Sequence, residues 1–97
     1  MKIQQALREI IRTGEIIHGT KETMEQIEQG NAELVVIAEN TPREIRKKIE
    51  EKTQEEKIPL KIYPGTSKEL GETCRRPHLA TTITVKDTGN VKKQQIQ

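Results

Sequence analysis

Few residues of this chain are suited to catalysis. The 97 residues include two histidines, His18 and His78, and one cysteine, Cys74. The sequence has neither the Gly-x-Ser-x-Gly elbow of serine hydrolases nor a Walker loop, and no pair of carboxylates stands apart from the charged helix surfaces. An isolated histidine ending a short strand is typical of a structural residue, and Cys74, four residues after Leu70, is typical of a helix core. The residues therefore predict no enzyme and no cofactor.

Residues suited to binding lie in three short motifs, each after a predicted strand and at the start of a predicted helix. The motifs are Gly19-Thr20-Lys21, Asn40-Thr41-Pro42 and Gly65-Thr66-Ser67. If the strands are parallel, all three lie along one edge of the sheet, where helix N-termini present unpaired N–H groups. There Gly19 admits a partner's backbone, Lys21 offers an ammonium to a phosphate, and Asn40 can read a base edge. Ordinary helix caps share this pattern, so both interpretations stay open here.

A basic loop precedes the last predicted strand. Between Glu72 and Asp87 the chain has no acid, whereas its basic residues there are Arg75, Arg76, His78 and Lys86. A positive rim would combine this loop with Lys21, Asn40, Arg43 and Arg46. Such a rim suits structured RNA, because phosphates set the affinity while splayed bases are read one by one. A solvated turn also explains two arginines, so this loop alone decides nothing.

Hydrophobic periodicity predicts four helices that alternate with four strands. The helices are expected at about 2–12, from Thr20 to a stop at Gly30, from Thr41-Pro42 to about Glu56, and, as a short helix with Leu70 and Cys74 on its inward side, from Thr66. The strands are expected at 15–18, 34–38, 58–63 and 81–86. We expect Gly14 to end the first helix as a C′ residue and Thr20 to N-cap the second, with Met24 and Ile27 on its buried face. Capping boxes are predicted for Thr41 with Glu44 and for Thr66 with Glu69.

The element order predicts an α/β fold with helices on both faces of one sheet. Five consecutive apolar residues at 34–38 are typical of a strand that is covered on both faces. Right-handed crossovers make most strands parallel, while the orientation of the last strand stays open. We expect residues 1–90 to form a single domain and residues 91–97, which have little to bury, to form a flexible tail.

Composition limits the class of protein. Charged residues make up 33% of the chain and hydrophobic residues 31%, with Tyr63 the only aromatic, so isoleucine, leucine, valine and alanine must build the core. A net charge of +2 is a weak argument for a polyanionic partner. A lone cysteine cannot form an intramolecular disulfide or a multi-cysteine zinc site, and neither a signal peptide nor a membrane span is recognisable. We therefore expect a soluble protein of the cytoplasm.

Four motifs, in order and spacing, resemble a known family. They are Gly19-x-Lys21, Leu34-Val-Val-Ile-Ala-x-Asn40-Thr41-Pro42, Gly65-Thr66-Ser67-x-Glu69-Leu70-Gly71 and Arg76-Pro77-His78. From about residue 1 to residue 90 the chain resembles the archaeal and eukaryotic large-subunit ribosomal protein thirty ("L-thirty-e") family. This family belongs to the kink-turn RNA-binding superfamily named after ribosomal protein "L-seven-Ae". The Arg-Pro-His motif points to the archaeal branch.

The resemblance implies a fold and a set of RNA contacts. The fold would be a three-layer α/β/α sandwich around a four-stranded mixed sheet of order 1-4-2-3, with the last strand antiparallel. Phosphate and the sheared G·A pairs of a kink-turn would be met by Gly19, Thr20 and Lys21, and a base edge by Asn40. Arg46 and Arg76 would lie on the RNA backbone, and the flipped-out base would pack against His78, Leu79 and Ala80. Thr41 and Arg43 would complete the RNA-binding set.

The resemblance also implies a function. The protein would be a structural constituent of the large ribosomal subunit that binds ribosomal RNA, with other large-subunit proteins as neighbours, and a monomer when free. One alternative is a free kink-turn RNA-binding protein that acts in regulation or in a guide-RNA particle. Another is a small α/β enzyme or ligand-binding domain that uses the same sheet edge, for which no general base or cofactor motif is found.

Overall fold

The predicted alternation of helices and strands is present in the computed structural model, which describes residues 1–75 and 81–96. The elements are α1 (Ile3–Thr13), β1 (Glu15–His18), α2 (Thr20–Glu28), β2 (Leu34–Ala38), α3 (Arg43–Glu55), β3 (Leu60–Tyr63), α4 (Ser67–Thr73), β4 (Thr82–Asp87) and the 3-10 helix η1 (Lys93–Gln95). Strands β1 and β2 have the predicted bounds. Each of the other predicted elements begins and ends within a few residues of its own predicted bounds.

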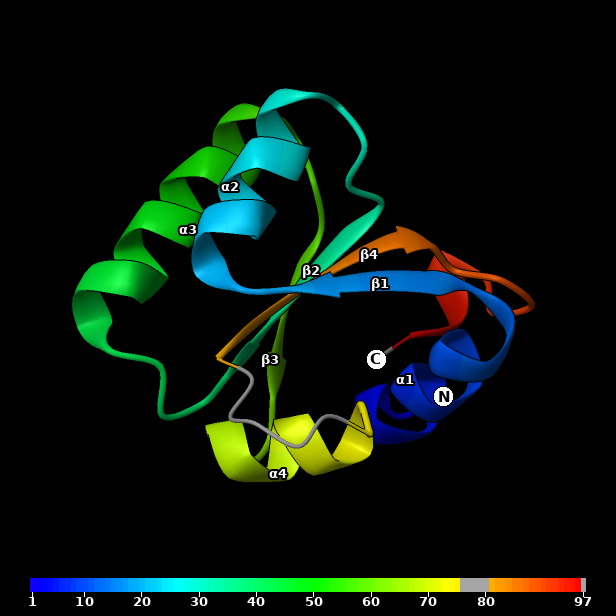
Figure 1. Cartoon of the computed structure of the whole chain (residues 1–97). Helices are drawn as coiled ribbons and strands as arrows, with labels where there is room; N and C mark the ends of the chain where they lie inside the picture. The colour runs from blue at the N-terminus through cyan, green and yellow to red at the C-terminus, as the bar shows by residue number, and fades with distance from the viewer. Residues whose placement is uncertain (76–80, 97) are drawn as a thin grey trace.

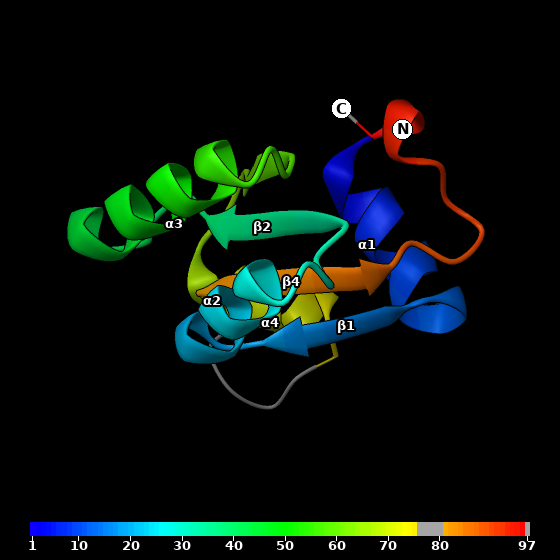
Figure 2. The ribbon, with the colours of Figure 1, turned by 90° about the horizontal axis from the view of Figure 1, so that it is seen from above.

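The four strands form one mixed sheet of order β1-β4-β2-β3. Strands β2 and β3 are parallel, in a register that pairs Val35 with Leu60 and Ala38 with Tyr63. Strand β4 is antiparallel to both of its neighbours, β1 and β2. Figure 2 shows the arrows of β1 and β2 pointing one way and that of β4 the other. The strand order and the antiparallel last strand that the resemblance implied are thus confirmed.

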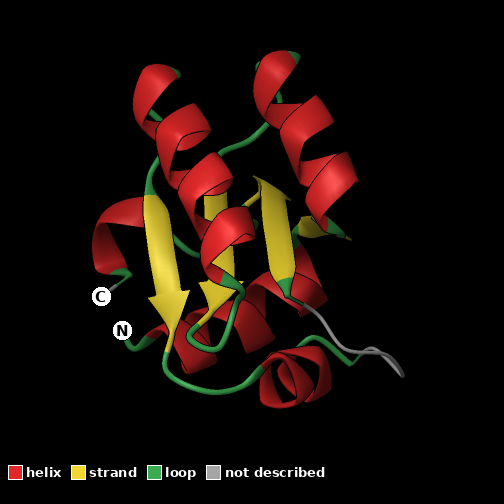
Figure 3. Ribbon diagram, turned by 90° about the vertical axis from the view of Figure 1, so that its left-hand side faces the viewer, coloured by secondary structure: helices red, strands yellow, loops and turns green. Residues whose placement is uncertain are grey.

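Helices cover both faces of the sheet, α1 and α4 on one and α2 and α3 on the other (Figures 1 and 3). Strand β2 supplies side chains to both cores: Val36 and its alternate neighbours face α1 and α4, whereas Val35 and Ile37 face α2 and α3. All five residues of β2 are buried, as a strand covered on both faces requires. The three-layer α/β/α sandwich is confirmed.

Gly14 ends α1, as predicted, but as its C-cap and not as a C′ residue. Its φ is −119° and its ψ −152°, which is extended backbone open to any residue. Glycine is required for space, because a Cβ at this position would clash with the carbonyl oxygen of Asp87. The left-handed position after a helix is instead filled by Gly30, which has a φ of +74° just after α2.

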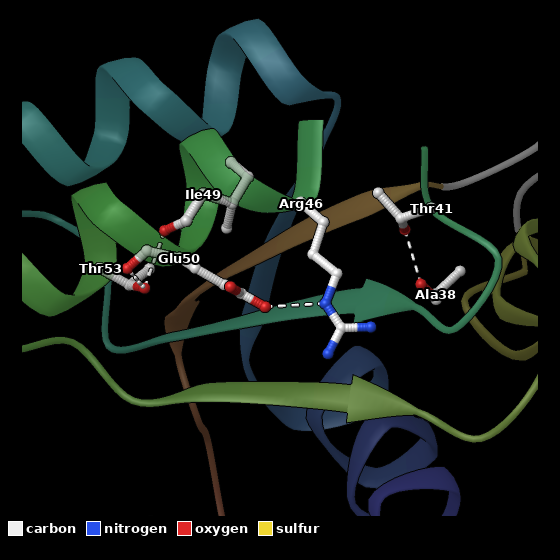
Figure 4. A network of polar contacts seen from close by, with 6 residues as sticks. All are labelled: Ala38, Thr41, Arg46, Ile49, Glu50 and Thr53. Atoms are coloured by element: carbon white, nitrogen blue, oxygen red, sulfur yellow. Dashed lines mark hydrogen bonds and ion pairs between the residues drawn. The ribbon is translucent and has the colours of Figure 1, made fainter. Parts of the chain in front are cut away.

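Two of the predicted N-caps are wrong. Helix α2 has Gly19 as its N-cap, with Thr20 already inside the helix. Helix α3 has Pro42 as its N-cap and no capping side chain. Thr41 lies one residue before the N-cap, where its hydroxyl donates to the carbonyl of Ala38 (2.6 Å, Figure 4) and stabilises the turn that leaves β2. The capping box of Thr66 and Glu69 on α4 is confirmed.

The segment that follows β4 buries more than we expected. Val91 is 3% exposed and Ile96 is 6% exposed, and both join the core that contains α1. The amino group of Met1 donates to the carbonyl of Gln95 (2.8 Å), so the N-terminus lies beside η1 (Figures 2 and 3). The expectation that residues 91–97 have little to bury is wrong at these two positions. The domain boundary at residue 90 and the flexibility of the tail stay predictions.

Candidate nucleic-acid interface

The three binding motifs lie along one edge of the sheet. Since β1 and β2 are both antiparallel to β4, and β3 is parallel to β2, the strands β1, β2 and β3 all end at the same edge. Helices α2, α3 and α4 begin there. We call this the carboxyl edge and define it as residues 19–21, 38–42 and 65–67 together with Thr81 and Thr82. The sequence prediction that these helix starts share an edge is confirmed.

Backbone hydrogen bonds tie the carboxyl edge together across the sheet. The N–H of Gly19 donates to the carbonyl of Thr82 (2.9 Å), and the N–H of Ala38 donates to the carbonyl of Thr81 (3.0 Å). On the other side, the N–H of Glu39 donates to the carbonyl of Gly65 (3.0 Å). Each motif is therefore held by a segment far away in sequence, which makes the edge a rigid surface.

The start of α2 combines a special backbone with charged side chains. Gly19 has a φ of +115°, a conformation that residues with a Cβ rarely adopt. The Glu22 carboxylate folds back onto Gly19, to the place that a Cβ would occupy. Lys21, the next residue but one after Gly19, is exposed. The first turn of α2 thus offers an exposed cation for a phosphate and the Glu22 carboxylate as a hydrogen-bond acceptor. Glu22 was not identified from the sequence because an acid in a first helical turn is commonplace.

Asn40 is positioned by a hydrogen bond to α4. Its Oδ1 accepts from the N–H of Ser67 (2.8 Å), although the side chain is exposed. Within the described part of the chain its Nδ2 has no partner, so two N–H donors face outward. The amide is therefore oriented to donate to an acceptor atom such as one on a base edge. Thr41, in contrast, is 8% exposed and its hydroxyl is engaged by Ala38, which makes it a positioning residue of the turn.

The predicted cations are divided between described and undescribed segments. Arg43 and Arg46 are exposed on α3, and Nε of Arg46 donates to Oε1 of Glu50 (2.7 Å, Figure 4). Arg75 is exposed at the end of the described segment, with a φ of +55°. The remaining predicted site residues, Arg76, His78, Leu79 and Ala80, lie outside the described residues.

Two buried threonines connect the α2 start to the central strand, and the sequence did not single them out. The hydroxyl of Thr84 donates to Oγ1 of Thr23 (2.7 Å), and both residues are 0% exposed. One turn earlier, the hydroxyls of Thr20 and Thr82 are 3.3 Å apart. These pairs hold α2 against β4. The one signal in the sequence for these pairs is that threonines alternate with apolar residues in β4, on a face that is also buried.

We expect Thr84→Val to lower the free energy of unfolding by about 1–3 kcal/mol, because it leaves the buried Thr23 hydroxyl without its donor. Combining it with Thr23→Val should recover most of that loss, since two apolar groups of similar shape replace a satisfied pair. Urea unfolding of the free protein measures both effects. If the double variant loses at least as much unfolding free energy as the two single variants together, this account of the pair is contradicted.

Neither a metal centre nor a membrane span is found in the described ranges. Across residues 1–75 and 81–96, no three His, Cys, Asp or Glu side chains come together in a way that could hold a metal ion. No helix in those ranges is long and apolar enough to cross a bilayer.

Comparison with known proteins gives consistent matches over nearly the whole chain. A model of the ribosomal protein L7Ae/L30e/S12e/Gadd45 family matches residues 1–95. The large ribosomal subunit protein eL30 of Methanopyrus kandleri is 36% identical over 88 residues, which cover 91% of this chain and 81% of that protein. The protein of the same name from Aeropyrum pernix is 34% identical over 90 residues, which cover 93% of this chain and 90% of that protein.

A solved structure supports the fold independently. A Bacillus halodurans protein of unknown function matches with a TM-score of 0.74 and 22% identity, over 88% of this chain and 85% of its own. Identity this low carries an argument about architecture alone.

Proposed function

The chain belongs to the ribosomal protein L7Ae/L30e/S12e/Gadd45 family, and from this membership we propose that it is a structural constituent of the large ribosomal subunit. It binds ribosomal RNA through the carboxyl edge, at a kink-turn or a similarly bent internal loop. Its neighbours are ribosomal RNA and other large-subunit proteins in the cytoplasm, and it is a monomer when free. The protein acts by holding the RNA bent and needs no catalytic chemistry.

The observation that carries this proposal is the rigid carboxyl edge. Its exposed groups are of the two kinds that RNA recognition requires: cations for phosphates, and oriented hydrogen-bonding groups for bases. Lys21 supplies the first kind, and Asn40 with the backbone at Gly19 and Thr20 the second. Two further exposed cations, Arg43 and Arg46, lie next to the edge on α3. Backbone hydrogen bonds join the start of α2 to Thr82 and join Glu39, after β2, to Gly65, before α4. We therefore expect the edge to bind a bent RNA without reorganising the protein.

The residues outside the described ranges have roles in the same proposal. Arg76 lies on the RNA backbone, and His78, Leu79 and Ala80 pack against the base that is flipped out at the bend. Their motif directly precedes Thr81 and Thr82, the residue before β4 and its first residue, which are part of the carboxyl edge. We therefore expect Arg76 to contribute affinity without sequence preference.

We expect the free protein to bind a kink-turn RNA more tightly than the same RNA with its G·A pairs replaced by Watson–Crick pairs. Titration of both RNAs at one salt concentration measures the preference. Sedimentation of a cell lysate then separates the proposed ribosomal role from that of a free kink-turn binder, because a ribosomal constituent travels with the large subunit. Equal affinity for the two RNAs would contradict binding through the bend.

A further inference from the structure

Helix α3 has its charges arranged in two blocks. Residues 43–48 hold four cations and one acid, whereas residues 50–56 hold four acids and one cation. The helix dipole favours the opposite order, with acids near the N-terminus and cations near the C-terminus. The dipole therefore does not account for the cations at the start of α3.

The cations of the first block have little to do inside the protein. Within the described residues, Arg43, Lys47 and Lys48 have no ion-pair partner, and all three are exposed. Arg46 binds Glu50 through Nε only, which leaves its two Nη groups without a partner in the same ranges (Figure 4). These positive charges are thus available to a ligand.

Three of the four cations line one depression on the surface. Arg43, Arg46, Lys47 and Glu50 surround a volume of about 340 Å³. Their spacing of three, four and seven residues places them on one side of the helix. Lys48 lies apart from this group: four residues later Lys52 pairs with Glu28 of α2 (3.6 Å), so Lys48 is on the side of α3 that faces α2. Two adjacent lysines therefore present their charges in different directions.

We propose that Arg43, Arg46 and Lys47 form a second RNA-contact surface, which binds the phosphate backbone next to the bent segment. This inference rests on the proposed function and adds Lys47, which the sequence did not assign. The surface begins directly after Pro42, so it is continuous with the carboxyl edge. Among the described residues the lining of the depression contains no apolar side chain, whereas a protein partner would be anchored by buried aromatic or aliphatic groups. A phosphodiester backbone is the polyanion that this combination fits.

Lys47→Ala and Lys48→Ala test the assignment, since they remove the same charge from adjacent positions of one helix. For a kink-turn RNA with flanking duplex, Lys47→Ala should weaken binding several-fold and lower the slope of log affinity against log salt by about one. Lys48→Ala should change neither quantity to a comparable extent. The preference for the kink-turn over its Watson–Crick variant should be unchanged, because phosphates carry no sequence information. Thermal melts should show both variants folded.

The possible outcomes separate this inference from the proposed function. Equal salt slopes for Lys47→Ala and Lys48→Ala would overturn the second surface. The proposed function would still stand if the wild type prefers the kink-turn RNA over its Watson–Crick variant. A wild type without that preference would contradict the proposed function instead. Binding of polyglutamate that Lys47→Ala abolishes, with RNA affinity unchanged, would assign the surface to an acidic protein segment and overturn an RNA contact.

Discussion

Replacing Ile37 with alanine should lower the free energy of unfolding of the RNA-free protein by about 2–5 kcal/mol. Ile37 is 0% exposed in the centre of β2, where it packs with Ile27, Val35 and Ile49 between the sheet and helices α2 and α3. Alanine would leave a cavity that these branched side chains cannot fill without moving backbone. Urea or thermal unfolding without RNA measures the loss, because the core is complete without a partner.

Ile62→Ala is a matched control for this prediction. Ile62 pairs directly with Ile37 across the parallel ladder, yet it lies in edge strand β3 and is 37% exposed. The same truncation should therefore cost about 1 kcal/mol or less. Similar losses at the two positions would mean that β2 is not the centre of the fold. A wild-type protein that is already unfolded at room temperature without RNA or denaturant would show that folding is coupled to RNA binding.

The fold could be predicted from the sequence wherever one residue pattern had one physical explanation. The apolar run at 34–38 has no polar face, so only a strand covered on both sides fits it, and the structure confirms this. Local pattern did not determine the orientation of β4, because an antiparallel or a parallel strand has the same alternation; the family resemblance supplied it. Val91 and Ile96 are isolated among polar residues, and only the packed α1 gives them something to bury against.

Side-chain roles were harder to predict, because they depend on acceptors that are distant in sequence. Thr41 has the spacing of an N-cap, but its hydroxyl donates to the carbonyl of Ala38, and α3 starts from Pro42 without a side-chain cap. The pair of Thr23 and Thr84 is separated by 61 positions, and no local pattern joins them. The shared edge of the three binding motifs, in contrast, follows from topology alone, and it was predicted correctly.

The expected effect of Asn40 on RNA recognition is larger than its effect on folding. We predict that Asn40→Ala reduces the preference for a kink-turn RNA over its Watson–Crick variant by about 1–3 kcal/mol, the usual value of a specific contact to a base edge. This corresponds to roughly tenfold for each 1.4 kcal/mol. Alanine also removes the acceptor for the N–H of Ser67, which should cost about 0.5–1.5 kcal/mol of stability at this exposed turn. Titrations and thermal melts measure the two effects separately.

Asn40→Asp separates reading of the RNA from support of the turn. A carboxylate retains an acceptor for the N–H of Ser67, so the turn and the melting temperature should be preserved, but it lacks both N–H donors that face outward. If those donors read a base, Asn40→Asp should lose as much of the preference as Asn40→Ala does. The added negative charge repels both RNAs alike, and so it cancels in the ratio of their affinities. If Asn40→Asp instead keeps the wild-type preference, Asn40 only positions α4 against the turn. Base recognition then belongs to another group at this edge of the sheet. The Glu22 carboxylate beside Gly19 would be the first of these groups to substitute.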